Sequence, residues 1–205
     1  MASVFPHLAH LKLPGLIKTE DADWSGIGAV FCGLPHATSQ EVIRDLPKRL
    51  KVIDMSADFR LRDAAVYEQW YGGPHRALEL QKEAVYGLTE HNREAVRKAR
   101  LVACPGCYPT AALMMILPLV EAGVIDAGDL IIDAKSGVSG AGRSLKQNIL
   151  FCEAGEGLSP YAVASHRHAP EMEQEISAVA GKAVIVNFTP HLIPMSRGEL
   201  CTTYA

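Results

Sequence analysis

The sequence of 205 residues has no long apolar run, no basic stripe and no leader-like start. Its longest apolar run, residues 111–120 with a proline inside, is shorter than the roughly 20 residues that cross a bilayer. The first ten residues, MASVFPHLAH, lack the charged and apolar regions of a secretory signal peptide. A net charge of −3 without clustered Lys or Arg argues against nucleic acid as a partner. We therefore expect no membrane and no nucleic-acid partner.

Cysteine is sparse and irregularly spaced. An odd count of five does not predict a disulfide scaffold, and it favours a reducing, cytoplasmic compartment. The single C-x-x-C pair has no second pair to complete a zinc site, so no metal is predicted. A composition of 48% hydrophobic and 21% charged residues is typical of a globular protein with a sizeable core.

The hydrophobic pattern predicts an α/β first part and an α+β second part. Short apolar strands alternate with helices up to residue 103, which favours a parallel sheet. The second part has longer connections and clustered late strands. The predicted strands are 27–32, 51–55, 101–103, 129–134, 183–188 and 200–204. The predicted helices are 38–50, 63–71, 89–100 with Thr89 as N-cap, 108–122 with a kink at Pro118, and 170–180.

One expected element is missing. A complete dinucleotide-binding fold opens with a strand and a Gly-rich turn that holds the pyrophosphate. No G-x-G-x-x-G lies between a predicted strand and helix in this sequence. We therefore predict a partial Rossmann-like domain over residues 1–104 and a catalytic α+β domain over residues 105–205 that is incomplete at its end.

A strand-to-helix turn carries the strongest chemical signal. It reads Cys104-Pro105-Gly106-Cys107-Tyr108-Pro109-Thr110. Cys107 would lie near a helix N-terminus, where partial positive charge favours a thiolate over a thiol. A thiolate can attack the carbonyl carbon of an acyl phosphate or an aldehyde. A buried structural cysteine and a Cys104–Cys107 redox pair are the alternatives.

A Gly-rich segment follows the predicted strand 129–134. It reads Ser136-Gly137-Val138-Ser139-Gly140-Ala141-Gly142-Arg143, after Lys135. Its glycines allow a close backbone approach to a ligand and present N–H groups to anionic oxygens. It is not a P-loop, because no Gly-Lys-Ser/Thr closes it. On composition alone, a flexible connection explains the segment equally well.

Two histidines flank an arginine just before the predicted helix 170–180. The segment reads Ser165-His166-Arg167-His168-Ala169-Pro170-Glu171. Histidine exchanges protons near neutral pH, and arginine holds a carboxylate through paired hydrogen bonds. A solvated polar loop is the alternative. His-x-His could bind a metal, but no carboxylate cluster supports that.

Two further segments follow predicted strands. They are Gly33-Leu34-Pro35-His36 and Ser56-Ala57-Asp58-Phe59-Arg60. In open α/β sheets, ligands bind at the carboxyl ends of the strands, so a cofactor could lie there. Either segment can equally be a simple turn. Tyr161 is interpreted as a packing residue.

In this order, the segments resemble the N-acetyl-γ-glutamyl-phosphate reductase family. Matching segments occur in the family's order over nearly the whole chain, at residues 4–8, 32–36, 54–60, 86–90, 105–110, 135–143 and 166–171. The resemblance implies a Rossmann domain plus a semialdehyde-dehydrogenase-like α+β domain, in a homo-dimer or tetramer. It also implies NADP(H)-dependent chemistry in arginine biosynthesis. Cys107 would form a thioester with N-acetyl-γ-glutamyl phosphate, and reduction would release N-acetylglutamate 5-semialdehyde and phosphate.

The resemblance also implies roles for individual residues. His166 is the first candidate for the acid/base and His168 the second. Arg167, Glu171 and Arg143 would bind the substrate. The predicted cofactor-binding residues are Gly33, Leu34, Pro35, His36, Ser56, Ser136, Gly137, Ser139, Gly140, Ala141 and Gly142.

The chain departs from the family pattern in two ways. Family members are longer at both ends, which implies a chain truncated at both ends, in the gene or only in this sequence. The commoner motif has Asn at the position of Cys104. Three alternatives stay open: an acyl-phosphate reductase for an aminoadipyl or aspartyl substrate, a thiol redox protein, and a fragment that cannot bind NADP. The Pro-Gly-Cys-Tyr-Pro-Thr setting of Cys107 argues against the aspartyl enzyme.

Overall fold

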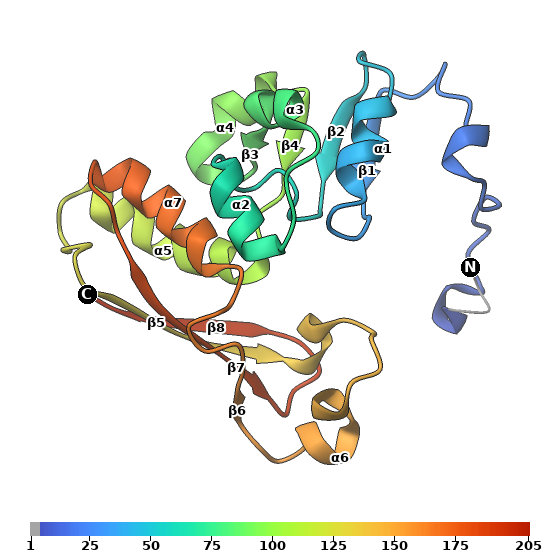
Figure 1. Cartoon of the computed structure of the whole chain (residues 1–205). Coiled ribbons are helices and arrows are strands. Elements are labelled where there is room, and N and C mark those ends of the chain that lie inside the picture. Colours follow the sequence, from blue (N-terminus) through green and yellow to red (C-terminus); the bar gives the residue numbers. More distant parts are fainter. Residues whose placement is uncertain (1–4) are drawn as a thin grey trace.

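The computed structural model describes residues 5–205. Val4 of the matching segment 4–8, and the first four residues of the predicted first domain, lie outside the described residues. The described chain opens with two short 3-10 helices, Pro6–Leu8 and Thr19–Asp21. Two sheets follow in sequence order (Figure 1). Among the described residues, no helix combines the length and apolar character needed to span a membrane.

The first sheet is parallel throughout, as predicted. Its strands are β1 (Ala29–Cys32), β2 (Lys51–Asp54), β3 (Val85–Tyr86) and β4 (Leu101–Ala103). Their spatial order is β1-β2-β4-β3. Because parallel strands end at the same edge of a sheet, the segments after Cys32, Asp54 and Ala103 meet there. This edge carries the segments that the sequence singled out at 33–36, 56–60 and 104–107.

The helices of the first part are short. They are α1 (Ser39–Asp45), α2 (Ala64–Tyr71), α3 (Leu78–Glu83) and α4 (Thr89–Lys98). The predicted helix 38–50 ends early because Pro47 cannot supply the N–H that a further turn needs. Asp63 caps α2 by accepting a hydrogen bond from the Ala65 N–H at 2.8 Å. The predicted N-cap role of Thr89 is wrong, because Leu88 occupies that position without a side-chain cap.

The second part is an α+β unit. Its helices are α5 (Cys107–Glu121), α6 (Phe151–Ala154) and α7 (Ala169–Ala180). Its strands are β5 (Leu130–Gly137), β6 (Ser159–Pro160), β7 (Val186–Ile193) and β8 (Glu199–Tyr204). The sheet order is β6-β7-β5-β8, with β5 and β7 parallel and both edge strands antiparallel. Strand β7 begins three residues later than the predicted start at 183 and continues past Pro190.

Helices α5 and α7 cover one face of the second sheet (Figure 1). Leu130, Ile132 and Ala134 alternate along β5 toward this face and are fully buried. Each such Leu or Ile contributes about 2 kcal/mol by burial. The same hydrophobic cluster takes in Tyr86 and Leu88, which belong to the first sheet and its connection. The two parts of the chain therefore share apolar packing where they meet.

Candidate active site

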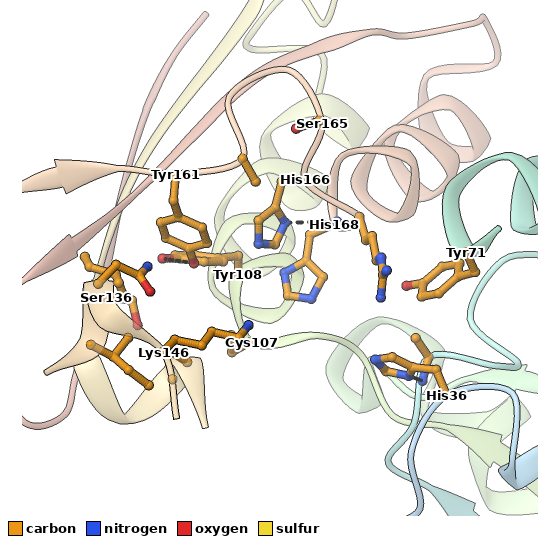
Figure 2. A pocket seen from close by; sticks show the side chains of 18 of the residues that line it. His36, Tyr71, Cys107, Tyr108, Ser136, Lys146, Tyr161, Ser165, His166 and His168 are labelled. Atoms are coloured by element: carbon orange, nitrogen blue, oxygen red, sulfur yellow. Dashed lines mark hydrogen bonds between the residues drawn. The ribbon is translucent and has the colours of Figure 1, made fainter. Parts of the chain in front are cut away.

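A cleft of about 480 Å³ opens at the carboxyl edge of the first sheet, against the second part of the chain. Figure 2 shows Cys107, Tyr108, His166 and His168 grouped together, with His36 and Tyr71 facing them. The lining residues are His36, Ala57, Arg60, Tyr71, Cys107, Tyr108, Ser136, Gly140, Ala141, Lys146, Asn148, Ile149, Tyr161, Ala162, Ser165, His166, Arg167, His168 and Leu192. Three predicted catalytic residues, Cys107, His166 and His168, therefore share one cavity.

Cys107 is the first residue of α5, with Gly106 as its N-cap. The thiol side chain is exposed to the cleft. Gly106 is required here because a Cβ at this position would lie only 2.3 Å from Nε2 of His168. The imidazole of His168 is thus packed directly against the backbone that carries the cysteine.

The charge state of Cys107 differs from the prediction. Although the Cys107 side chain is exposed to the cleft, the surrounding walls partly desolvate its sulfur, and this effect, followed by the neighbouring Glu199 carboxylate, raises its pKa to about 11. The backbone N–H groups of Tyr108 and Cys107 act in the opposite direction, as the helix N-terminus predicts, but they are outweighed. The raised pKa favours the thiol over the thiolate at neutral pH, so the use of Cys107 as a nucleophile requires a base.

His166 is held by aromatic rings and by one backbone hydrogen bond. Its Nδ1 accepts from the His168 N–H at 3.1 Å. The rings of Tyr108, Tyr161 and Phe188 lie 5.8, 5.5 and 5.2 Å from it, centroid to centroid. Burial, followed by the charge of Arg167, lowers the His166 pKa to about 4, so the ring is neutral near pH 7. A neutral ring whose Nδ1 accepts a hydrogen bond carries its hydrogen on Nε2.

His168 lies next to His166, with ring centroids 4.7 Å apart. Burial, His166 and Arg60 lower its pKa to about 3, in that order of size. Its Nδ1 is buried and has no hydrogen-bond partner among residues 5–205. Two imidazoles with lowered pKa values thus line the same cleft as the Cys107 thiol. His168 can accept a proton at the ring nitrogen that carries no hydrogen, whereas His166 can do so at Nδ1 only by giving up the hydrogen bond from the His168 N–H.

His36 and Tyr71 form the opposite wall. The Nδ1 of His36 accepts the Ala57 N–H at 3.0 Å, which fixes the ring against the segment after β2. The Tyr71 ring lies 5.5 Å from His36, and the Arg167 guanidinium lies 5.0 Å from the centre of the same ring. Tyr71 therefore bridges the first part of the chain and the histidine segment.

Behind this wall lies a buried carboxylate, Asp58. It accepts hydrogen bonds from the Ala37 N–H at 2.8 Å, the Ser39 hydroxyl at 2.6 Å and the Tyr67 hydroxyl at 2.6 Å. Ala37 has a φ of 67°, a left-handed conformation that the Asp58 contact helps to hold. Burial raises the Asp58 pKa, but these hydrogen bonds outweigh it and the net pKa is lowered. The network fixes the position of His36, the neighbour of Ala37.

The predicted cofactor residues separate into two groups. Those that line the cleft are His36, Ser136, Gly140 and Ala141. Those that do not are Gly33, Leu34, Pro35, Ser56, Gly137, Ser139 and Gly142. Ser56 is only 2% exposed and hydrogen bonds Asp54. Gly137 allows a close approach between two backbone segments of the protein, because a Cβ built at this position would lie 2.7 Å from the backbone of Arg197.

The predicted substrate residues are also spread. Arg167 lines the cleft, whereas Arg143 does not and lies 4.7 Å over the ring of Phe5. Glu171 is 1% exposed and is absent from the cleft wall. These roles stay predictions.

The structure adds cleft residues that the sequence did not single out. Tyr71 reaches the cavity from the end of α2, and Lys146 and Asn148 reach it from a short 3-10 helix, Gln147–Ile149, and its N-cap. Tyr161, interpreted as packing, donates its hydroxyl to Tyr108 at 3.0 Å and also lines the cleft. Only their three-dimensional position identifies these residues, because no motif surrounds Tyr71 or Lys146.

Two family models match the chain. Residues 1–99 match the semialdehyde dehydrogenase NAD binding domain, and residues 107–205 match the semialdehyde dehydrogenase dimerisation domain. Together they account for nearly all of the sequence.

Curated relatives share high identity. A probable N-acetyl-γ-glutamyl-phosphate reductase, chloroplastic, from Arabidopsis thaliana is 59% identical over 204 residues, which are 100% of this chain and 51% of the relative. An N-acetyl-γ-glutamyl-phosphate reductase from Rhodobacter capsulatus is 59% identical over 205 residues, or 100% and 60% of the two chains. The chain thus spans between about half and three fifths of the length of these relatives.

Solved structures of low sequence identity share the fold. Aspartate semialdehyde dehydrogenase II from Vibrio cholerae superposes with a TM-score of 0.61 at 15% identity, over 90% of this chain and 57% of that one. Aspartate semialdehyde dehydrogenase with NADP from Candida albicans gives a TM-score of 0.53 at 12% identity, over 86% and 49% of the chains.

Proposed function

Because the chain belongs to the semialdehyde dehydrogenase family, we propose that it carries the catalytic site of an N-acetyl-γ-glutamyl-phosphate reductase. The proposed reaction is the NADPH-dependent reduction of N-acetyl-γ-glutamyl phosphate to N-acetylglutamate 5-semialdehyde and phosphate. The observation that carries the proposal is the placement of Cys107, His166, His168 and Arg167 in one cleft between the two parts of the chain. Relatives at 59% identity bear this activity in their names.

In the proposed mechanism, the Cys107 sulfur attacks the γ-carbonyl carbon of the acyl phosphate. A C–S bond forms, the bond to the phosphate oxygen breaks, and phosphate leaves with its electron pair. The raised pKa of Cys107 means that a base must take the thiol proton. After the thioester is reduced at its carbon, the C–S bond breaks and the semialdehyde is released with Cys107 restored.

His166 is proposed to act on the carbonyl oxygen. Its Nδ1 is occupied by the His168 N–H, so Nε2–H is free to donate. A donor at this place stabilises the oxygen that becomes negative when sulfur adds to the carbonyl. To take the thiol proton itself, His166 would first have to give up the His168 contact. His168, packed on Gly106, the residue before Cys107, is proposed as the alternative base.

The residues of the cleft fit the nicotinamide end of NADP(H). Gly140 and Ala141 line the cavity, and a Cβ on Gly140 would lie 2.7 Å from the Ser136 Oγ, so glycine lets this segment pack directly against Ser136. NADPH, when bound, supplies the hydride that reduces the thioester. His36, Ser136, Gly140 and Ala141 would hold the ring against the Cys107 side of the cleft. An aspartate semialdehyde dehydrogenase of this fold has been solved with NADP.

The test is phosphate-dependent reduction of NADP⁺ by N-acetylglutamate 5-semialdehyde, followed by NADPH absorbance. Cys107→Ser should abolish the signal, and Cys104→Ser should largely spare it. A signal that survives Cys107→Ser, or one that appears only with an aspartyl or aminoadipyl semialdehyde, would overturn the assignment. Loss in both serine variants together with NADP-independent thiol exchange would indicate a redox protein instead.

The assembly and the compartment are part of the same proposal. We propose a homo-oligomer, a dimer or tetramer, in the cytoplasm. Supporting it, the second part matches a dimerisation domain, and Ile131, Leu200 and Tyr204 are exposed on the sheet face away from α5 and α7. Light scattering should give a mass at least twice that of the 205-residue chain. A strictly monomeric protein would contradict the oligomer.

A further inference from the structure

A buried carboxylate on α7 contacts the turn that carries the nucleophile. Glu171 lies in the first turn of α7, and its Oε1 accepts the Gly106 N–H at 2.8 Å. Gly106 is the N-cap residue directly before Cys107. The carboxylate is 1% exposed and lies outside the cleft wall, so it reaches the chemistry only through this backbone.

The same carboxylate is bound from the first part of the chain. The Tyr86 hydroxyl donates to Glu171 Oε1 at 2.8 Å, and Nη1 of Arg60 lies 3.5 Å from Oε2. Arg60 also donates through Nε to the Cys104 carbonyl at 2.7 Å. The Cys104–Cys107 turn is thus held at two backbone points, Cys104 and Gly106. Cys104 is bound by Arg60 and Gly106 by Glu171, and these two side chains contact each other.

This arrangement leaves the turn little freedom. A carboxylate with three donors has a fixed position, and an unpaired one in this place would be costly. Gly106 is confined on its other side by the His168 ring. A displacement of about 1 Å at a reacting atom can change turnover on the order of 100-fold.

We propose that Glu171 is a positioning residue that orients Cys107 by holding the Gly106 N–H, with Tyr86 and Arg60 as its supports, and that it does not bind substrate. The inference rests on the proposed function for its kinetic consequence and on the structure alone for its backbone consequence.

The kinetic test compares Glu171→Ala and Glu171→Gln with Glu175→Gln. Glu175 is the matched control, because it lies one turn further on α7, is buried, and pairs with Arg62 of the first part at 2.8 Å without touching the turn. Glu171→Ala should lower kcat roughly 100-fold and leave KM for the semialdehyde within about threefold. Glu171→Gln keeps an acceptor oxygen and should lose only about tenfold. A rise in KM with kcat unchanged would overturn the proposal in favour of substrate binding.

The backbone test is hydrogen exchange at the Gly106 amide. Glu171→Ala should speed it at least tenfold, Glu171→Gln less, and Glu175→Gln by less than about twofold. Equal exchange in all variants, or an equal effect of Glu175→Gln, overturns the proposal. If Glu171→Ala does not fold, Tyr86→Phe replaces it, with an expected threefold increase. Wild-type protein without phosphate-dependent NADP⁺ reduction would refute the proposed function, while the exchange rates would still decide the role of Glu171.

Discussion

The two walls of the cleft are held in place by different means. The wall from the first part rests on buried hydrogen bonds, in which Asp58 accepts three donors behind His36. The wall from the second part includes exposed residues outside its main helices and strands, namely Lys146, Asn148, Ser165 and Arg167. The difference teaches that changes in the first wall should act through stability, and changes in the second wall through the reaction.

The largest effect on the reaction, after loss of Cys107 itself, is expected at His166. Replacing it with alanine should lower kcat about 100-fold to 1,000-fold, because a donor to the developing oxyanion is lost. Glutamine can place an N–H near the former Nε2 and should recover at least tenfold of this loss. Asparagine places its side-chain N–H only near the former Nδ1, so His166→Asn should not recover this loss. The urea midpoints of all three variants should stay close to that of the wild type.

That series also tests the separation of the two walls. Glutamine as inactive as alanine would mean that His166 takes a proton rather than donates a hydrogen bond. A large fall in the urea midpoint would mean that this wall, too, acts through stability.

In contrast to the His166 variants, replacement of Asp58 should lower the stability of the protein. Asp58→Asn removes a buried charge from three donors and should cost about 3 kcal/mol of the free energy of unfolding. Urea unfolding measures this directly. The control is Asp45→Asn, an exposed partner of Arg44, which should change stability by less than about 0.5 kcal/mol. A loss of turnover without destabilisation would show that Asp58 serves the reaction instead.

The pH dependence of stability is expected to differ between His166, in the wall from the second part, and Asp58, behind the wall from the first part. Burial, followed by Arg167, lowers the His166 pKa to about 4, so between pH 6.5 and 4 the unfolded chain binds a proton that the native chain does not. His166 therefore favours unfolding as pH falls through this window, by about 1 kcal/mol per pH unit. The Asp58 pKa is lowered below 3.8, so its stabilisation is retained until lower pH and is lost as the carboxylate protonates.

Urea unfolding as a function of pH measures both windows. His166→Gln should flatten the slope between pH 6.5 and 4, and Asp58→Asn should reduce the loss at the acid end. Unchanged slopes in both variants would refute these assignments.

The smallest effect is expected at Lys146, an exposed side chain of the second wall. Lys146→Ala should raise the KM for inorganic phosphate in the NADP⁺-reduction assay by about tenfold, because a cation facing the anion is lost. The free energy of unfolding should change by less than about 0.5 kcal/mol. Lys182→Ala, outside the cleft and paired with Asp126, should alter neither quantity. Equal KM values for Lys146→Ala and wild type would remove Lys146 from the site.

The same contrast explains what could be predicted from the sequence. Strands β1, β2 and β4, helices α1, α2 and α4, and the cysteine turn were recognisable because apolar periodicity and turn residues are local signals. Helix α3 and strand β3, of six and two residues, were not predicted. Strand β7 was misplaced because Thr189-Pro190 is typical of a turn. The structure accepts Pro190 in the strand, and its carbonyl receives the Tyr161 N–H at 3.0 Å.

The site was predictable only where a motif marks it. Cys107, His166, His168 and His36 were found, whereas Tyr71 and Lys146 come from segments without a motif. The sequence predicted the pKa-lowering effect of the helix N-terminus on Cys107, which is a local property, but not the effects that raise the pKa. The cleft walls and Glu199, which outweigh the helix N-terminus, come together only in the folded chain. Tertiary contacts thus determine both which residues line the cleft and the pKa of Cys107.

The Glu171 network has a consequence for unfolding. If the first sheet melted alone, Glu171 would lose the hydrogen bond from Tyr86 and the contact with Arg60. Tyr86 and Leu88 would also withdraw from the cluster formed with α5 and α7. The two sheets are therefore coupled, and the chain should unfold in a single cooperative transition rather than sheet by sheet.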